Sequence, residues 1–546
     1  MEHPVLLARA GFRGRGSVSG RSAGMSAPDS GARARRWGLG LIYALCWILP
    51  FRLPLAAALG SWFKFAPDGL IGIYAVYCAL WCLRTRTKLR WRKADGAFAL
   101  FLLFGLVSTL FVNHIPLIRY LHQVRSFGMY YLLAFALRQA GVGRESLPGV
   151  LRQLQWVSWP VAALGIVERL FSKTVLFSQS AARAIYSFDN LGRVYSAFQN
   201  PNTYAMFLTI LLLLSLLLQL RGEKKTPLPL YIQLAVMMVL TMSRASLLLL
   251  AGLLPVLAVL LGKPLWKRWK ALLPRCALIA LCAAAVSLLL PRGAEAIYFA
   301  GVQKVLEGGD PRPEMPLTVT PVTFTGADGS DYQGYYFCDI TYVDERCAIP
   351  LREAGAVIHL ESGDVTLPVA DNERREAWIY SNAVLKSFHV SSRTRLSALT
   401  QARTYQVQVN GRVSSVLTAL RIAKDHPVFG TGFGTYGSAS SSAWTPPTCE
   451  RYGVVPGFYA DCQYSSTLAE TGFVGLGLLL LFLFTVVWEN RKCLPAVVLC
   501  LILGWYGVFF NMLEVHIGAF LLWTLLQLGQ DTDISLQSLK HSLDVC

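Results

Sequence analysis

Long runs of apolar residues recur along almost the whole of this chain, and they constrain its fold more than any other feature. Most runs approach the roughly 20 residues that a helix needs to cross the ~30 Å hydrocarbon layer of a bilayer. Backbone groups inside a bilayer must hydrogen-bond to one another, so such runs form helices. Hydrophobic residues make up 54% of the chain and charged residues 15%, more apolar surface than a soluble core buries. The sequence therefore predicts an all-α polytopic membrane protein.

The apolar runs predict about twelve transmembrane helices in two groups, separated by a long polar segment. The first group lies within 37–290, at roughly 37–60, 69–83, 96–112, 118–137, 149–167, 203–220, 227–241, 245–262 and a stretch ending near Leu290. The second group lies within 472–528, at 472–488, 494–511 and 514–528. An even number of spans would place both termini on the same side of the membrane.

Basic residues cluster in short connections on one side of the predicted bundle. The segment 84–93, RTRTKLRWRK, has six basic residues in ten, and KPLWKRWKALLPR at 263–275 has five. Because short loops rich in Lys and Arg stay on the cytoplasmic side, we predict a multi-pass membrane protein with cytoplasmic termini. The net charge of +19 is then mostly topological, and it gives no reason to expect nucleic acid as a partner.

Both ends of the chain are predicted to lie in the cytoplasm. Residues 1–36 contain seven Arg and many Gly and Ser but little apolar surface, which predicts a disordered basic segment. A second methionine, Met25, leaves the start codon open, and the apolar run that follows has no obvious cleavage site for a signal peptide. Residues 529–546 form the predicted C-terminal tail.

The segment 291–471 interrupts the apolar pattern and is predicted to lie outside, on the side of the membrane opposite the basic loops. PLTVTPVTF, YYFCDITYVD and AVIHLESGDVTLPV alternate apolar and polar residues between turn signals, which is typical of short strands. We therefore predict a small strand-rich inserted module over about 311–411, with one helix at 373–388. This module is either a passive spacer or lid, or a substrate-recognition element.

The rest of the polar segment, 412–471, is predicted to be an active-site helix and loop. A helix should begin at Arg412 and stop near His426, because Pro427 lacks a backbone donor. The glycine-rich turn VFGTGFGTYG then lets the backbone approach a ligand or another segment closely. Dinucleotide loops also have Gly-x-Gly spacing, but no strand-helix-strand unit surrounds this one.

Several polar side chains are predicted at the outer ends of the spans. A charge such as Arg244 costs ~2.5 kcal/mol or more if it faces lipid, so it should face a cavity or a partner. A structural salt bridge is one interpretation. Anion binding is the other, because Arg193, Arg244 and Arg412 are predicted on one face and guanidinium groups match phosphate oxygens bidentately. Asn200 and Asn202 are expected to cap the following span, or to contact a ligand.

Two carboxylates precede the tenth predicted span. We expect Glu470 to be structural and Asp461 to be the better candidate for a general base, with His426 in a supporting role. Four cysteines fall in the outward segment, where an oxidising exterior allows the local pairs 338 with 347 and 449 with 462. The chain has no Cys/His cluster typical of zinc, so we expect neither a metal nor a cofactor.

Four motifs together carry a resemblance to a known family. GRVYSAFQNPNTYA, MSRAS, RVSSVLTALRIAKDHPVFGTGFG and DCQYSSTLAETGFVGL resemble, in order and spacing, the bacterial O-antigen ligase and O-antigen polymerase superfamily. The resemblance covers about 190–480 apart from the strand-rich module. It implies an inner-membrane glycosyltransferase that uses undecaprenyl-pyrophosphate-linked glycans, with a periplasmic active site, an inverting mechanism and no metal.

The resemblance also implies roles for individual residues. By position, Arg193, Arg244 and Arg412 are similar to the family's arginines that hold the lipid pyrophosphate. Ligases have a His followed by Asn where this chain has Asp461 and Cys462. This departure is similar to the polymerase or exopolysaccharide branch. The inserted module is a second departure, and the resemblance does not account for it.

These observations predict an enzyme that polymerises lipid-linked oligosaccharide repeat units into O-antigen or exopolysaccharide. Its expected partners are the lipid-linked oligosaccharide, membrane lipid, and a chain-length regulator and flippase of the same pathway. A ligase that transfers glycan to lipid A core or to protein is one alternative. A polytopic transporter or lipid-linked-sugar flippase is another, but it would place charges along the midplane of broken helices, whereas here they gather at the outer ends.

Overall fold

The computed structural model describes most of the helical sequence and short pieces of the segment that interrupts it. The described residues are 30–170, 193–198, 200–220, 226–289, 412–452, 454, 459–491, 493–529 and six strands within 318–381. The backbone of the strands and of 256–273 is described, but their side chains are not. The predictions for residues 1–29, for Cys347 and for the tail after residue 529 therefore lie outside the described residues.

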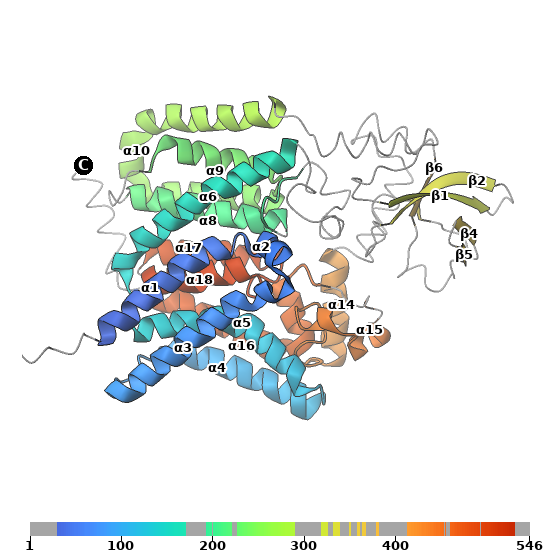
Figure 1. Cartoon of the computed structure of the whole chain (residues 1–546), viewed down its shortest axis with the longest axis horizontal. Helices are drawn as coiled ribbons and strands as arrows, with labels where there is room; N and C mark the ends of the chain where they lie inside the picture. Colours follow the sequence, from blue (N-terminus) through green and yellow to red (C-terminus); the bar gives the residue numbers. More distant parts are fainter. Residues whose placement is uncertain are drawn as a thin grey trace, which may run out of the picture.

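A bundle of long helices forms most of the described chain (Figure 1). The helices before the strands are α1 (Ser30–Ile48), α2 (Arg52–Leu59), α3 (Ala66–Thr85), α4 (Lys93–Leu106), α5 (Leu117–Gln139), α6 (Leu147–Leu170), α8 (Pro201–Leu220), α9 (Leu228–Leu240) and α10 (Arg244–Leu289). Those after the strands are α14 (Arg412–Asp425), α15 (Pro447–Tyr452), α16 (Gln463–Glu489), α17 (Leu494–Tyr506) and α18 (His516–Gly529). A π-helical segment, Val107–Val112, extends α4.

Several of these helices are suited to a membrane. Among the described residues, four helices are long and apolar enough to cross one: Ser61–Thr85, Lys93–Val112, Pro201–Gln219 and Gln463–Glu489. A fifth span results if Gly31–Ile48 and Arg52–Leu59, bent by 81°, are taken together. The prediction of a mainly helical chain is therefore confirmed, and several of its helices are long and apolar enough to cross a membrane. The number twelve stays a prediction, because the other helices are shorter or more polar.

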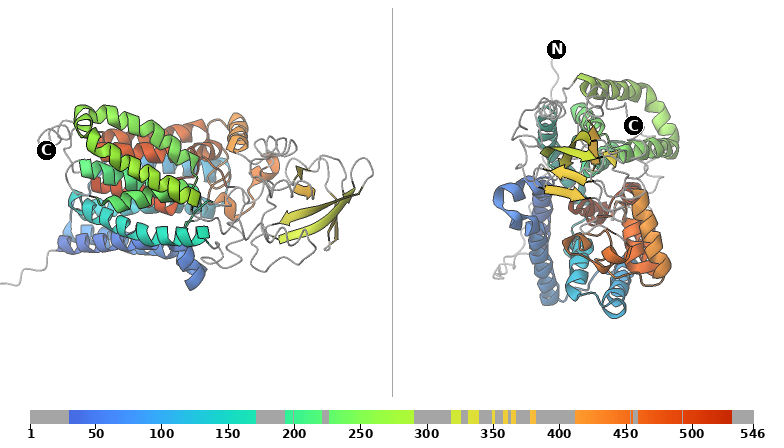
Figure 2. Two further views of the ribbon diagram at one scale, coloured as in Figure 1. Left: turned by 90° about the horizontal axis from the view of Figure 1, so that it is seen from above. Right: turned by 90° about the vertical axis from the view of Figure 1, so that its right-hand side faces the viewer.

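Three predicted boundaries are wrong. Helix α1 begins at Ser30, inside the segment predicted to be disordered, and Arg35 near its start pairs with Glu145. Helix α10 continues through 263–275, which was predicted to be a loop, and bends between its apolar halves (Figure 2). Helix α18 begins at His516, which leaves Glu514 in the connection before the helix rather than in a span.

The core of the bundle joins helices that are far apart in sequence. Phe98 of α4, Tyr131 of α5, Phe482 of α16 and Trp523 of α18 form one aromatic cluster, with ring centroids 4.5 to 5.6 Å apart. Edge-to-face and tilted pairs of this kind add to the stabilisation that comes from burying the rings. The cluster fixes α16 against α4 and α5, and so positions the polar segment that precedes α16.

The described polar segment lies at one end of the bundle. Helices α14 and α15 and the turn between them lie there, as do the strands (Figures 1 and 2); we call this the α14 end. The predicted helix from Arg412 is confirmed, and it ends at Asp425, before Pro427. Of its apolar residues, Ile422 is buried, whereas Val416 and Leu417 are exposed, so the helix packs on α16 with a different face from the one its apolar residues mark.

Six short strands lie in the interrupting segment. They are β1 (Thr318–Thr325), β2 (Asp331–Cys338), β3 (Ile349–Pro350), β4 (Val357–Leu360), β5 (Gly363–Thr366) and β6 (Trp378–Ser381). Their order is β3-β6-β2-β1-β4-β5, with antiparallel neighbours. The helix predicted over 373–388 is wrong at 378–381, where Trp-Ile-Tyr, residue types that favour strands, form β6. A self-contained module stays a prediction.

Candidate functional site

The glycine-rich turn after α14 crosses the start of α16 in close contact. Gly430 has φ of +64°, and a Cβ placed on it would lie 2.4 Å from the backbone of Glu470 and Thr471. Gly472 has φ of +66°, and its Cβ would lie 2.6 Å from the carbonyl oxygens of Pro427 and Val428. Only glycine accepts this conformation and this approach together. The glycines therefore serve contact between two segments of the chain.

Glu470 holds the same turn from inside the protein. Its Oε1 accepts hydrogen bonds from the backbone N–H groups of Gly434, Thr435 and Tyr436, each at 3.0 Å, and from the Ser438 hydroxyl at 2.8 Å. The side chain is 1% exposed, so no acceptor substrate can reach it. These contacts are those of a structural residue that shapes the turn.

The π-helical end of α4 fastens the other side of the turn. Thr109 accepts a hydrogen bond from the Phe433 amide at 2.9 Å, and Ser108 donates one to the Phe429 carbonyl at 2.6 Å. The Phe433 ring is fully buried beside Phe101 and Phe127. The turn is thus a fixed wall at the α14 end of the bundle.

A second polar group surrounds the start of α8. Asn200 Oδ1 accepts a hydrogen bond from the Asn202 backbone amide at 2.7 Å. Asn200 is therefore the N-cap residue of α8. Asn202 Oδ1 accepts from Arg193 at 3.2 Å and from the Ser243 hydroxyl at 2.9 Å. The Arg193 Nε also donates to the Thr241 carbonyl at 3.0 Å. We call this group, with Arg244, the α8–α10 cluster.

Arg244 differs from the other members of the cluster. It is the first residue of α10 and is exposed. Its side chain makes no hydrogen bond or ion pair with another described residue. A helix N-terminus carries partial positive charge from its macrodipole, so an arginine there concentrates positive charge rather than balancing it. A bound anion would be stabilised by the guanidinium group and by the helix end together.

The end of α17 connects the α8–α10 cluster with the start of α16. Tyr506 shares a hydrogen bond with Ser246, two residues after Arg244, and Trp505 donates to the Ala245 carbonyl at 2.9 Å. Directly after α17, the Gly507 carbonyl accepts a hydrogen bond from the Gln463 backbone amide at 2.8 Å. Asp461 lies two residues before Gln463, so one short stretch of α17 places the two predicted functional regions at the same end of the bundle.

Asp461 is exposed and does not cap α16. The N-cap residue is Cys462, so Asp461 lies one position before it, where a carboxylate is still favoured by the helix dipole. Asp461 has at least one further interaction within the protein. Exposure leaves it accessible to a substrate hydroxyl, in contrast to Glu470.

The two remaining predicted site residues belong to α14. Arg412 begins the helix, at the α14 end as predicted, but its side chain lies outside the described part of the structure. His426 follows the last residue of α14 and is half-buried. Burial, and then the charge of Arg451, lower the pKa of His426, so the imidazole is neutral at physiological pH.

The predicted disulfide between Cys449 and Cys462 is wrong in this structure. Both thiols are free and buried, the first within α15 and the second at the N-cap of α16, so each is fixed by its own helix. Among the described residues no three His, Cys, Asp or Glu side chains come together to hold a metal ion. Independence of metals stays a prediction.

The sequence analysis missed Glu514, which joins three elements at the α14 end. Its carboxylate accepts from Gln123 of α5 at 2.6 Å, from the Ala439 amide at 2.6 Å and from the Tyr459 hydroxyl at 3.3 Å. Burial raises the pKa of Glu514 to about 7. An acid at the start of an apolar run was the available signal, because such residues are costly unless they have partners.

A further charged group links α3, α5 and α18. Arg125 lies 3.4 Å from Asp68, and the His516 imidazole lies 2.9 Å from the Tyr130 hydroxyl and 4.0 Å from the Asp68 carboxylate. Arg125 and Asp68 neutralise each other, which marks them as structural. The nearby Arg119 stacks over Trp444 at 4.8 Å and thereby ties α5 to the polar segment.

Comparison with known proteins adds no relative. No family model matches this chain, and no curated protein matches it. The case for a function therefore depends on the residues and their geometry.

Proposed function

We propose that this protein is an inner-membrane glycosyltransferase that polymerises undecaprenyl-pyrophosphate-linked oligosaccharide repeat units at the periplasmic face. The observation that carries the proposal is the α8–α10 cluster. There Arg193 is fixed by Asn202 and Thr241, while Arg244 is exposed at the start of α10. Two guanidinium groups and a helix N-terminus suit a pyrophosphate. The four sequence motifs support the same class of donor.

In the proposed reaction, an acceptor sugar hydroxyl attacks the anomeric carbon of the lipid-linked glycan. The new glycosidic bond forms as the bond between that carbon and the pyrophosphate oxygen breaks, and undecaprenyl pyrophosphate leaves. Arginines stabilise the negative charge that develops on the leaving group, a role in which fixed electrostatic groups are effective. Attack from the face opposite the leaving group inverts the anomeric centre.

Asp461 is the proposed general base that takes the proton of the acceptor hydroxyl. Its exposure and its position at the same end as the α8–α10 cluster support this assignment. Glu470 is unsuited because its carboxylate is buried and shared among four donors. His426 is the alternative base.

The glycine-rich turn supplies the rigid support for this site. Its hydrogen bonds to Glu470 and Thr109, and the buried ring of Phe433, leave little freedom to the turn at residues 433–438. Groups held in this way lose little conformational entropy when substrate binds.

One reconstitution experiment separates the proposed polymerase from its alternatives. The full chain is placed in liposomes with a fluorescent undecaprenyl-pyrophosphate-linked repeat unit, with or without lipid A core as acceptor. A ladder of glycan lengths without lipid A core is the expected result. Transfer only to lipid A core would assign a ligase. Movement of the lipid across the bilayer with no new glycosidic bond would contradict both, and would assign a flippase.

A further inference from the structure

Helix α14 leaves an apolar surface exposed. Val416, Leu417 and Leu420 are between 38% and 47% exposed, whereas Ala419 and Ile422 are buried against the rest of the protein. We call the three exposed residues the α14 apolar face. A helix on the surface of a soluble protein turns such residues toward the core. An exposed apolar patch instead marks contact with a membrane or with another molecule.

The turn after α14 carries this apolar surface on to two long helices of the bundle. Val428 of the turn is 48% exposed, and Phe473 of α16 is 56% exposed. The Phe473 amide donates to the Pro427 carbonyl at 2.8 Å, and the Phe429 ring stacks on Phe104 of α4 at 5.3 Å. Both α4 and α16 belong to helices that are long and apolar enough to cross a membrane. The turn therefore adjoins the surfaces most suited to lipid.

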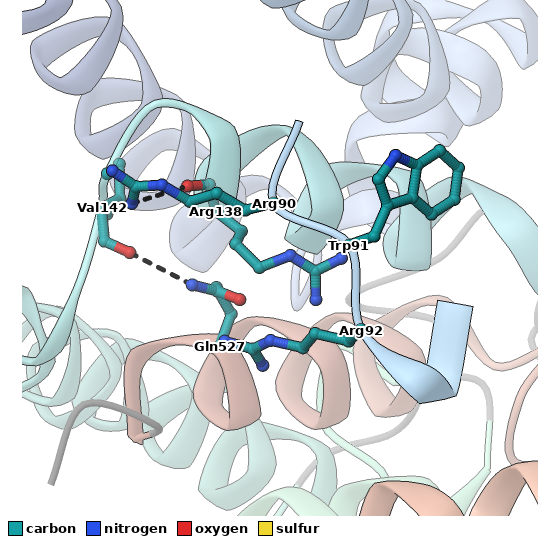
Figure 3. A pocket seen from close by; sticks show the side chains of 7 residues that line it. Arg90, Trp91, Arg92, Arg138, Val142 and Gln527 are labelled. Carbon is teal, nitrogen blue, oxygen red and sulfur yellow. Dashed lines mark hydrogen bonds between the residues drawn. The ribbon is translucent and has the colours of Figure 1, made fainter. Parts of the chain in front are cut away.

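The opposite end of the bundle supplies a reference level along its axis. The Lys93 amide at the start of α4 donates to Glu489 at the end of α16, at 2.8 Å, so these two helix ends lie at one level. Arg90, Arg92 and Arg138 gather next to them (Figure 3). Charged residues gathered at helix ends are typical of the boundary of the hydrocarbon layer.

Two helices measure the distance from this level to the turn. Ser108 donates to the Phe429 carbonyl at 2.6 Å and lies fifteen residues after Lys93, which is about 23 Å along a helix. Phe473 lies sixteen residues before Glu489, which is about 24 Å. Both distances are shorter than the ~30 Å hydrocarbon layer. A layer that begins at Lys93 therefore reaches the turn and the end of α14.

The orientation of α14 also suits a membrane surface. The helix crosses the direction of the long helices (Figure 1), and it lies at the rim of the bundle when the molecule is seen from the α14 end (Figure 2). Arg421 and Lys424 are exposed beside the apolar face. Helices that lie in the plane of a membrane surface combine an apolar face with such basic residues, which reach the headgroups.

We propose that α14 is an interfacial helix whose apolar face, Val416, Leu417 and Leu420, inserts into the lipid bilayer at the α14 end. The bilayer is favoured as the occupant because this face lies at the level of the lipid boundary and adjoins the exposed apolar residues of α4 and α16. Lipid contact would then hold the helix that begins at Arg412 and leads into the glycine-rich turn. The proposal does not depend on the glycosyltransferase assignment.

The test introduces a small fluorescent amino acid at Leu420 of the full chain, by stop-codon suppression, in liposomes of phosphatidylcholine and phosphatidylglycerol. Phosphatidylcholine with brominated acyl chains quenches a label that contacts lipid, and aqueous iodide quenches one in water. We expect the brominated lipid to quench the label at Leu420 at least about threefold more than a label at Asp425. Asp425 is exposed on the same helix and accepts a hydrogen bond from Tyr452. Leu480 of α16, 48% exposed, gives the value for lipid contact.

The other outcomes each overturn the proposal. Quenching of the Leu420 label by iodide, without quenching by brominated lipid, would place the face in water. Quenching by neither reagent would mean that another part of the chain or a second copy covers it. A label at Leu417 repeats the measurement independently, and thermal unfolding checks that each labelled protein is folded. Because the readout needs no turnover, it holds whether or not the glycan ladder forms.

Discussion

The glycine-rich turn and the α8–α10 cluster lie at the same end of the bundle, but they differ in whether their ionisable side chains have partners within the protein. Around the turn, the buried carboxyl group of Glu470 accepts hydrogen bonds from four neighbouring groups. In the cluster, Arg244 is exposed at a helix end that adds to its positive charge. A charge whose partners are all within the chain stabilises the fold. A charge that has no partner among the described residues is a candidate to bind a ligand.

The strongest test of this contrast replaces Arg244. We expect Arg244→Ala and Arg244→Lys each to lower polymer formation by about 10²–10³-fold, because an ammonium group cannot reproduce bidentate contact with phosphate. The assay is the glycan ladder in liposomes. The control is Arg275→Lys, an exposed arginine of the same helix, which should leave activity unchanged. Wild-type activity in Arg244→Lys would reduce Arg244 to a structural charge.

A second test asks whether the exposed carboxylate beside the cluster performs chemistry. Asp461→Asn keeps the shape but cannot accept a proton, so turnover should fall by about 100-fold while the lipid-linked donor still binds. Asp461→His should retain partial activity, since a neutral imidazole accepts protons near pH 7. Asp425→Asn, at the end of α14, is the matched control. If Asp461→Asn proved silent, the search for the base would move to His426.

For the glycine-rich turn, the contrast predicts that removing Glu470 lowers the stability of the fold. Glu470→Ala leaves several buried backbone N–H groups without an acceptor, each costing about 1–3 kcal/mol. We therefore expect the free energy of unfolding to fall by roughly 3–5 kcal/mol, measured by denaturation in detergent micelles. Glu489→Ala on the same helix should cost less than about 1 kcal/mol, because Glu489 accepts one backbone bond in a half-buried position. Similar losses in the two variants would contradict a special role for Glu470.

Glu514 extends the comparison to pH. Its pKa in the folded protein is raised to about 7 by burial, so the folded state binds a proton that the unfolded state has released above about pH 4.5. The unfolding free energy should therefore fall as pH rises from 5 to 8, by on the order of 2–3 kcal/mol. Thermal unfolding across this range measures it. Glu514→Gln should make the profile shallower, and an unchanged slope would exclude Glu514 as a contributor.

The smallest expected effect concerns metals. Since arginines carry the positive charge in the proposed site, EDTA should leave polymer formation unchanged within about twofold. The glycan ladder is compared before and after chelation. Inactivation by EDTA that magnesium reverses would show that a divalent cation shares the role assigned to Arg193 and Arg244.

Local sequence rules succeeded where one interaction dominates. Apolar runs locate helices because a backbone in a bilayer has no water to bond to. Pro427 ends α14 because proline lacks a donor, and Asn200 caps α8 because its side chain reaches the free amide of Asn202. These outcomes depend on neighbours within a few residues, which the sequence displays directly.

The same rules failed where distant parts of the chain decide. The pairing of Cys449 with Cys462 was plausible from spacing alone, but each thiol is held in its own helix. Near the start of α1, Arg35 pairs with Glu145, which lies 110 positions away. The strand at 378–381 pairs with β2 and β3, and a short apolar run does not reveal such partners.

By itself, the sequence determined the helical class and the residue types gathered near the proposed site. Only the tertiary structure separated Glu470 from Asp461, since both are carboxylates before an apolar run, and only packing buries one and exposes the other. It also found Glu514, whose three partners come from α5 and from the segments around Ala439 and Tyr459. Burial and hydrogen bonding are set by contacts across the fold, and these decide whether a charge stabilises the protein or is available to a substrate.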